Sequence, residues 1–131
     1  MKKKDTLFIE FMLCEDQRKA QKIIHECSHK DLVAALIDMN GNYRDISKSA
    51  KKLLGYEDHE ILKDSMFTMT HRSDKSELFR AFSIAMNKGA MFRFTQRLRC
   101  FNGQYLPVVT HMKKVESSEN DDVVFCLMVR A

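Results

Sequence analysis

The chain has 131 residues and a formal net charge of +4, from 22 basic and 18 acidic side chains. This length fits a single domain with one core, and no apolar run approaches the roughly 20 residues of a membrane-spanning helix. Basic and acidic residues are interleaved, which disfavours direct nucleic-acid binding. We therefore expect a globular cytoplasmic protein with neither nucleic acid nor membrane as a direct partner.

The first 31 residues are predicted to form an N-terminal arm and a flanking helix. Residues 6–13 are apolar and fit either a short strand or an arm. Residues 15–30 have helical spacing. Their apolar stripe comprises Ala20, Ile23, Ile24 and Cys27. Such a stripe suits either packing on the outside of a sheet or contact with a second copy of the chain.

A strand, a tight turn and a short helix are predicted next. Residues 32–37 form a near-continuous apolar run, typical of a strand covered on both faces. Asn40 and Gly41 tolerate positive φ, as a tight hairpin requires. The short helix that follows ends at Gly55, where a left-handed residue costs least.

The segment ALIDMNGNYRDISKSAKKLLGYEDHEIL resembles the opening of a PAS domain. The family pattern is an apolar strand, D-x-x-G, a short strand, and A-x-x-L-L-G-Y-x-x-x-E-L. The matching residues are Asp38, Gly41, Ala50, Leu53, Leu54, Gly55, Tyr56, Glu60 and Ile61, the last of which stands where leucine is usual. The resemblance covers about residues 32–129. It implies the fold, but PAS domains serve many signalling proteins and share no single chemistry.

After an irregular segment at residues 64–70, the strongest helical pattern of the chain runs to Gly89. Its predicted core stripe comprises Leu78, Phe79, Phe82, Ala85 and Met86. In PAS domains this is the long helix that packs across the sheet. His71 stands before it, where the family often has H-P-D-D, and we expect this residue to close the turn.

Two strands with alternating side chains are predicted at residues 91–100 and 105–114. Matching their apolar faces predicts a three-residue turn, which places Leu98 opposite Leu106 and Phe94 opposite Thr110. A last strand, at residues 123–129, is apolar on both faces and is therefore central.

Together these elements predict an α+β fold. A five-stranded antiparallel sheet carries short helices and one long helix on one face, with the N-terminal helix flanking it. The domain is predicted to span residues 32–131, after an N-terminal segment at residues 1–31.

The sequence contains no recognisable catalytic motif, and we predict no enzymatic activity. His25 and His29 lie four residues apart on a predicted helix but have no third ligand, so no metal site is predicted. By the resemblance, flavin-binding members carry a reactive cysteine after the short helices, and residues 64–70 contain none. Haem-binding members often use a histidine on the long helix, and residues 75–87 contain none. We therefore predict no cofactor.

A small apolar ligand between the long helix and the sheet is an alternative to a filled core. The cavity-lining residues in that case are Phe67, Phe79, Phe82, Phe94 and Met112.

The other face of the sheet mixes arginines with apolar side chains, which suits a protein interface as well as a solvated basic face. With the N-terminal helix, the predicted interaction surface comprises Ile23, Ile24, Arg93, Arg97, Arg99, Tyr105, Val109 and His111.

The resemblance implies a non-catalytic regulatory module in signal transduction, acting through protein–protein contacts or homodimerisation. Such a module usually belongs to a larger signalling protein, a histidine kinase or a transcription regulator, and in a eukaryotic regulator it is nuclear. The alternative function is the sensing of a small molecule bound in the cavity.

Overall fold

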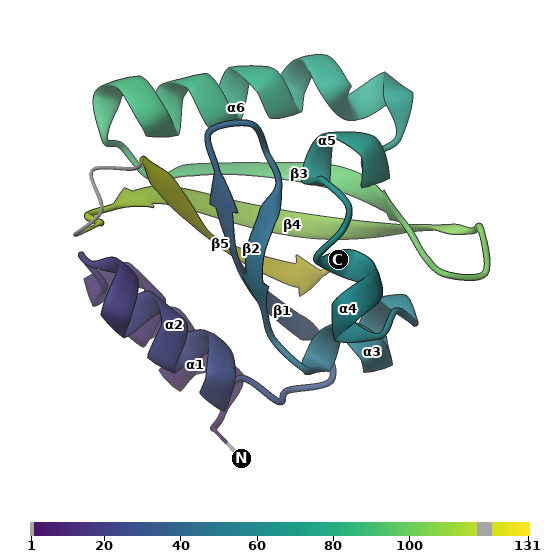
Figure 1. Cartoon of the computed structure of the whole chain (residues 1–131), viewed down its shortest axis with the longest axis horizontal. Coiled ribbons are helices and arrows are strands. Elements are labelled where there is room, and N and C mark those ends of the chain that lie inside the picture. Colours follow the sequence, from purple (N-terminus) through teal and green to yellow (C-terminus); the bar gives the residue numbers. More distant parts are fainter. Residues whose placement is uncertain (1, 118–121) are drawn as a thin grey trace.

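The computed structural model describes residues 2–117 and 122–131, and its strands form one antiparallel sheet (Figure 1). The strands follow the order β2-β1-β5-β4-β3. Their bounds are β1 (Leu32–Asp38), β2 (Tyr43–Ile46), β3 (Phe92–Arg99), β4 (Tyr105–Val115) and β5 (Val123–Arg130). This topology confirms the predicted α+β fold, with the first and last strands as neighbours inside the sheet.

Two neighbouring interior strands, β1 and β5, are covered on both faces. Every side chain of residues 32–37 and 123–128 is fully buried. Their near-continuous apolar sequences require such burial, because an exposed face would leave large aliphatic side chains in water. The sheet therefore needs a layer of helices on each side.

The β3–β4 hairpin has the predicted register. Leu98 lies opposite Leu106, and Phe94 lies opposite Thr110. The backbone N–H of Cys100 donates to the carbonyl of Gln104 at 2.7 Å, which leaves three residues in the turn. The last of these, at position 103, is a glycine with a φ of +87°.

One face of the sheet, here called the inner face, is covered by α3 (Ser49–Leu54), α4 (Asp58–Ile61), α5 (Met66–Met69) and α6 (Lys75–Lys88). Helix α5 lies in a segment for which the sequence predicts irregular structure. Its first turn is stabilised by Ser65, whose hydroxyl accepts from the N–H of Thr68. All four cysteines are free, and only Cys100 is partly exposed.

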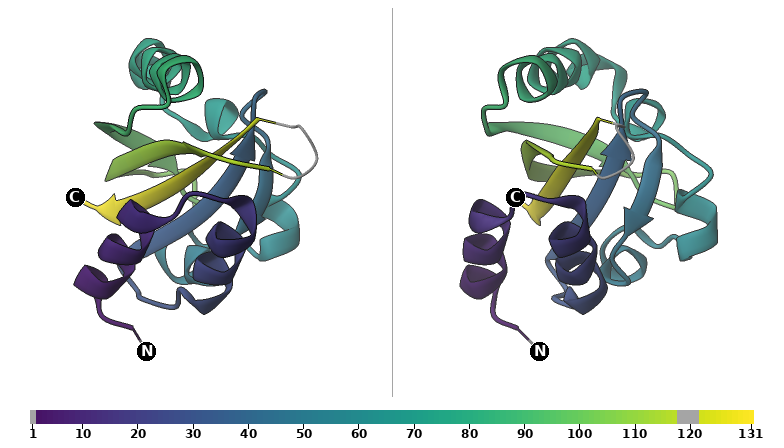
Figure 2. Two further views of the ribbon diagram at one scale, coloured as in Figure 1. Left: turned by 90° about the vertical axis from the view of Figure 1, so that its left-hand side faces the viewer. Right: turned by 60° about the vertical axis from the view of Figure 1, so that its left-hand side comes forward.

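The opposite, outer face is covered in part by α1 (Lys4–Leu13) and α2 (Gln17–Glu26), which Figure 2 shows as two separate helices packed below the sheet. The expectation of a strand or an arm at residues 6–13 is wrong, because these residues belong to α1. Helix α2 ends at Glu26, so His29 lies beyond it and does not share its face with His25. Because α1 and α2 share a core with the sheet, the division at residue 31 stays a prediction.

Among the described residues, no helix combines the length and the apolar character that crossing a membrane requires.

Candidate functional site

The strand alternation gathers the predicted arginines and aromatic residues on the outer face. Arg93 lies opposite His111, and Arg99 lies opposite Tyr105. Residues directly opposite each other in an antiparallel pair share one face of the sheet. The exposed outer side chains of this region include Arg93, Arg97 and Tyr105. The outer face of β3 and the first half of β4 is thus left uncovered.

Helix α1 packs beside this uncovered region. Leu7 and Phe11, one turn apart, are buried, and the Phe11 ring lies 4.7 Å from that of Phe125 in β5. The ammonium of Lys113, in β4, donates to the carbonyls of Phe11 and Met12 at 3.3 and 2.9 Å. The last carbonyls of a helix lack intrahelical partners, so this cation both satisfies them and complements the helix dipole. Lys113 therefore fastens the end of α1 to the sheet.

The side of α1 that faces away from the sheet is also apolar. Ile9, Met12 and Leu13 are 58%, 47% and 75% exposed. Their spacing places them on one helix face, which we call the α1 stripe. Single exposed apolar residues are common in monomeric proteins, whereas a contiguous group of them marks a contact site. The α1 stripe is therefore a candidate binding surface.

Charged residues stand at both ends of α1. Lys3 and Lys4 lie at its beginning, Glu15 lies just beyond its end, and all three are exposed. No ion pair within the described part of the chain engages them. The beginning of α1, where the exposed Asp5 also lies, thus has a net positive charge, and the free carboxylate of Glu15 lies beyond the other end of the helix.

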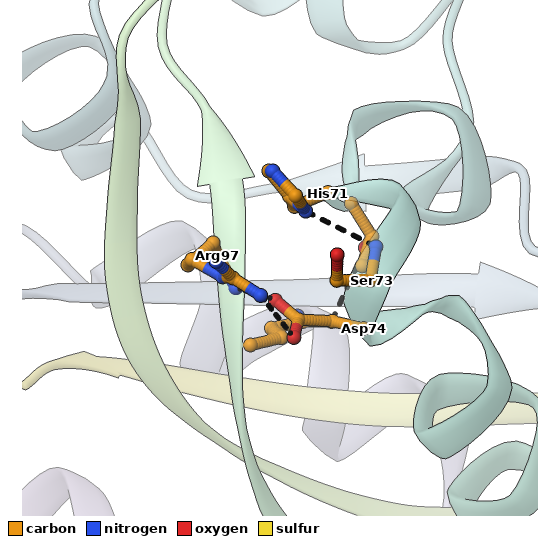
Figure 3. A network of polar contacts seen from close by, with 6 residues as sticks. His71, Ser73, Asp74 and Arg97 are labelled. Carbon is orange, nitrogen blue, oxygen red and sulfur yellow. Dashed lines mark hydrogen bonds and ion pairs between the residues drawn. The ribbon is translucent and has the colours of Figure 1, made fainter.

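Two of the three predicted surface arginines are bound within their own chain, as Figure 3 shows for Arg97. Its guanidinium donates to the two oxygens of Asp74 at 3.0 and 2.9 Å, and its backbone N–H donates to the same carboxylate at 2.8 Å. This arginine lowers the pKa of Asp74. The guanidinium of Arg99 lies 3.7 Å from Asp64. Both pairs fasten the edge strand β3 to segments that precede α6.

His71 closes the turn before α6, as predicted. Its ring Nδ1 accepts from the backbone N–H of Ser73 at 3.1 Å (Figure 3). Its backbone N–H donates to the carbonyl of Arg97 at 2.9 Å. The residue therefore has a structural role at the edge of β3.

Three residues of the predicted interaction surface are covered by the chain itself. Ile23 and Ile24 are 6% and 0% exposed, because the stripe of α2 packs on the sheet of its own chain. His111 is 6% exposed, with the ring of Phe8 from α1 only 4.8 Å away. In this arrangement they are not accessible to a partner. In the two N-terminal helices, the exposed large apolar side chains are Ile9, Met12 and Leu13 of α1.

The residues predicted to line a cavity mostly fill the inner core. Phe67, Phe82, Phe94 and Met112 pack there between the helices and the sheet. Phe79 is instead 54% exposed and stacks on Phe67 at 4.6 Å. A shallow groove of about 290 Å³ runs past Phe79 and Phe82, between α6 and the β1–β2 turn.

One polar group of the inner core is unpaired. The hydroxyl of Tyr43 is fully buried and has no hydrogen-bond partner among the described residues. Its burial raises the pKa of the phenol. By contrast, the buried amide of Gln96 bonds both Thr70 and Thr110. Leaving a buried hydroxyl unpaired lowers the free energy of unfolding by about 1–3 kcal/mol. A polar atom of a bound molecule would remove this penalty by pairing with the Tyr43 hydroxyl.

A sequence model of the family described as PAS fold matches residues 43–130, more than half of the chain. The chain belongs to the PAS family. PAS domains are generally sensory, non-catalytic modules of signalling proteins, and they commonly mediate protein–protein interaction. No curated protein sequence matches this PAS domain.

Solved PAS structures share the fold of this PAS domain at low sequence identity. A tryptophan-to-alanine variant of Drosophila melanogaster Cycle PAS-B with bound glycerol is 17% identical, with a TM-score of 0.70 over 76% of this chain and 99% of that chain. A PAS domain from Desulfitobacterium hafniense is 16% identical, with a TM-score of 0.64 over 79% and 95%. The N-terminal domain of a Marinobacter aquaeolei diguanylate cyclase with a PAS/PAC sensor is 14% identical, with a TM-score of 0.61 over 76% and 94%.

The α1 stripe of this PAS domain has only a weak sequence signal. Because α1 is apolar on two opposite sides, its residues show no single stripe of helical period. The signal that the sequence does contain is two separate apolar pairs, each with a spacing of four residues. Leu7 and Phe11 lie on one side of the helix, and Ile9 and Leu13 lie on the other.

We expect the substitution Asp74→Asn to lower the urea midpoint of unfolding at pH 7. The pKa of Asp74 is depressed in the folded protein, so the stabilisation is fully present above the ordinary aspartate pKa of about 3.9 and is lost as the pH falls below it. The difference between wild type and variant should therefore shrink as the pH is lowered from 7 toward 3. An undiminished difference at pH 3 would contradict the role of the charged pair with Arg97.

Proposed function

We propose that this PAS domain is a non-catalytic regulatory module that acts by binding a protein, and that the bound protein is a second copy of the same chain. It would serve as the input or dimerisation element of a larger signalling protein, a histidine kinase or a transcription regulator. The observation that carries this proposal is the α1 stripe, which is apolar and exposed on a helix already docked to the sheet.

The stripe adjoins the uncovered part of the sheet. Phe8, next to the stripe on α1, contacts His111, and His111 is paired across strands with Arg93. Val109 and Tyr105 continue this outer surface along β4. An apolar centre bordered by arginine and tyrosine matches the usual composition of protein interfaces.

The charges at the ends of α1 favour a second copy as the partner. In a two-fold symmetric pair, two α1 helices cross in antiparallel directions, and the same surface is used on both copies. Lys3 and Lys4 of one copy then approach Glu15 of the other, and the α1 stripes face each other. Each end of the helix thereby finds a charge of opposite sign.

We expect the double substitution Ile9→Asp with Leu13→Asp to convert a concentration-dependent dimer into a monomer. Sedimentation velocity between about 1 and 100 μM spans the range of micromolar self-association. Both side chains are exposed, so thermal stability of the monomer should change little.

The matched control is Phe79→Asp, which alters a comparably exposed apolar residue on α6. This variant should keep the wild-type dimer. A monomeric wild type across the whole range would contradict self-association, and loss of the dimer only in the Phe79 variant would move the interface to α6.

A second candidate function, the sensing of a small molecule in the inner core, is favoured by the unpaired hydroxyl of Tyr43. A bound molecule with one polar atom would pair this hydroxyl and place its apolar part among the side chains of the inner core. Cycle PAS-B, which shares the fold, has been solved with bound glycerol, which shows only that such a core in that protein admits a small molecule.

We expect native mass spectrometry of the purified wild type to show a retained small molecule if the inner core is a binding site. Tyr43→Phe removes only the hydroxyl, so it should reduce that retention while leaving the fold intact. Identical empty spectra of both proteins, with the variant at least as stable as the wild type, would contradict the sensing function and leave the interaction function unaffected.

A further inference from the structure

A titratable residue lies inside the contact between α1 and the sheet. The imidazole of His111, in β4, is 6% exposed and is flanked by two rings of α1, with centroids 4.8 Å away for Phe8 and 6.4 Å away for Phe11. Its Nδ1 is buried and has no hydrogen-bond partner within residues 2–117 and 122–131. The contact therefore accommodates a neutral imidazole but provides no acceptor for a proton on Nδ1.

The charged side chains nearest to His111 are both positively charged. Arg93 faces it from β3 as its cross-strand partner, and Lys113 lies two residues further along the same face of β4. From β5 the opposite residue is the apolar Leu127, and α1 contributes the two aromatic rings. A proton on His111 would therefore add a third positive charge to an apolar contact without a described carboxylate against the ring.

We propose that His111 makes the docking of α1 on the sheet dependent on pH: the helix is held over a neutral imidazole and is released when the imidazole becomes protonated. This inference concerns the attachment of α1 to its own chain, so it holds whether or not the α1 stripe binds a second copy. Release of α1 would uncover His111 and neighbouring apolar residues of the outer face.

The direction of the effect follows from linkage. Burial lowers the pKa of His111, and the charge of Arg93 lowers it further. Docking is thus strongest above the ordinary histidine pKa of about 6.5 and weakens as the pH falls below it. When the imidazole is protonated only in the undocked state, the equilibrium constant for docking falls by up to about tenfold between pH 7.5 and pH 5.5.

Amide hydrogen exchange of the full chain at pH 7.5, 6.5 and 5.5, corrected for intrinsic exchange rates, tests this proposal. We expect the protection of α1, relative to that of α6, to fall by up to about tenfold in the wild type. In His111→Phe, whose ring suits the apolar contact, and in His111→Gln, which stays neutral, the relative protection should not change with pH.

Lys113→Met is the matched control, because it removes the bonds to the last carbonyls of α1 without removing the imidazole. Its α1 protection should be lower than that of the wild type at pH 7.5 and should still fall as the pH is lowered, because the imidazole remains. A wild-type pH dependence that persists in both His111 variants would overturn the proposal. So would a parallel loss of protection in α1 and α6, which would mean global unfolding.

Discussion

The burial of β1 and β5 on both faces is the constraint on which the rest of the structure depends. Their side chains are apolar at almost every position, so one layer of helices is not enough to remove them from water. Helices α3 to α6 supply one layer, and α1 and α2 supply the other. The N-terminal segment thus covers apolar side chains of the sheet, although the family match begins only at residue 43.

This constraint also determines which part of the sheet stays exposed to a partner. Two short helices cover β1, β5 and the end of β4, but they leave β3 and the first half of β4 open on the outer face. The inner face is closed by side chains that pack among themselves. The proposal of a partner on the outer face rests on this difference between a closed inner face and a half-covered outer face. Two of the arginines that border the open region, Arg97 and Arg99, form ion pairs that hold β3 against the segments before α6.

Patterns that depend on neighbouring strands were predictable from the sequence, whereas contacts between distant segments were not. The pairing of Leu98 with Leu106 follows from side-chain alternation, because only one register buries both apolar sets. The stripe of α2 showed that Ile23 and Ile24 would be buried, but periodicity cannot distinguish burial on the same chain from burial on a partner. Phe79 has the helical spacing of a core residue, yet its place at the border of the stripe leaves it half exposed.

Self-association through the outer surface of α1 can be followed by the oxidation rate of individual methionines as a function of protein concentration. Met12 lies in the α1 stripe, while Met39 and Met91 are comparably exposed elsewhere, at 60% and 44% against 47%. Buried thioethers are protected from oxidants. We expect the oxidation of Met12 to slow as the protein concentration rises, while the oxidation of Met39 and Met91 stays constant. Unchanged oxidation of Met12, or slowing at Met39 or Met91 instead, would contradict self-association through this surface.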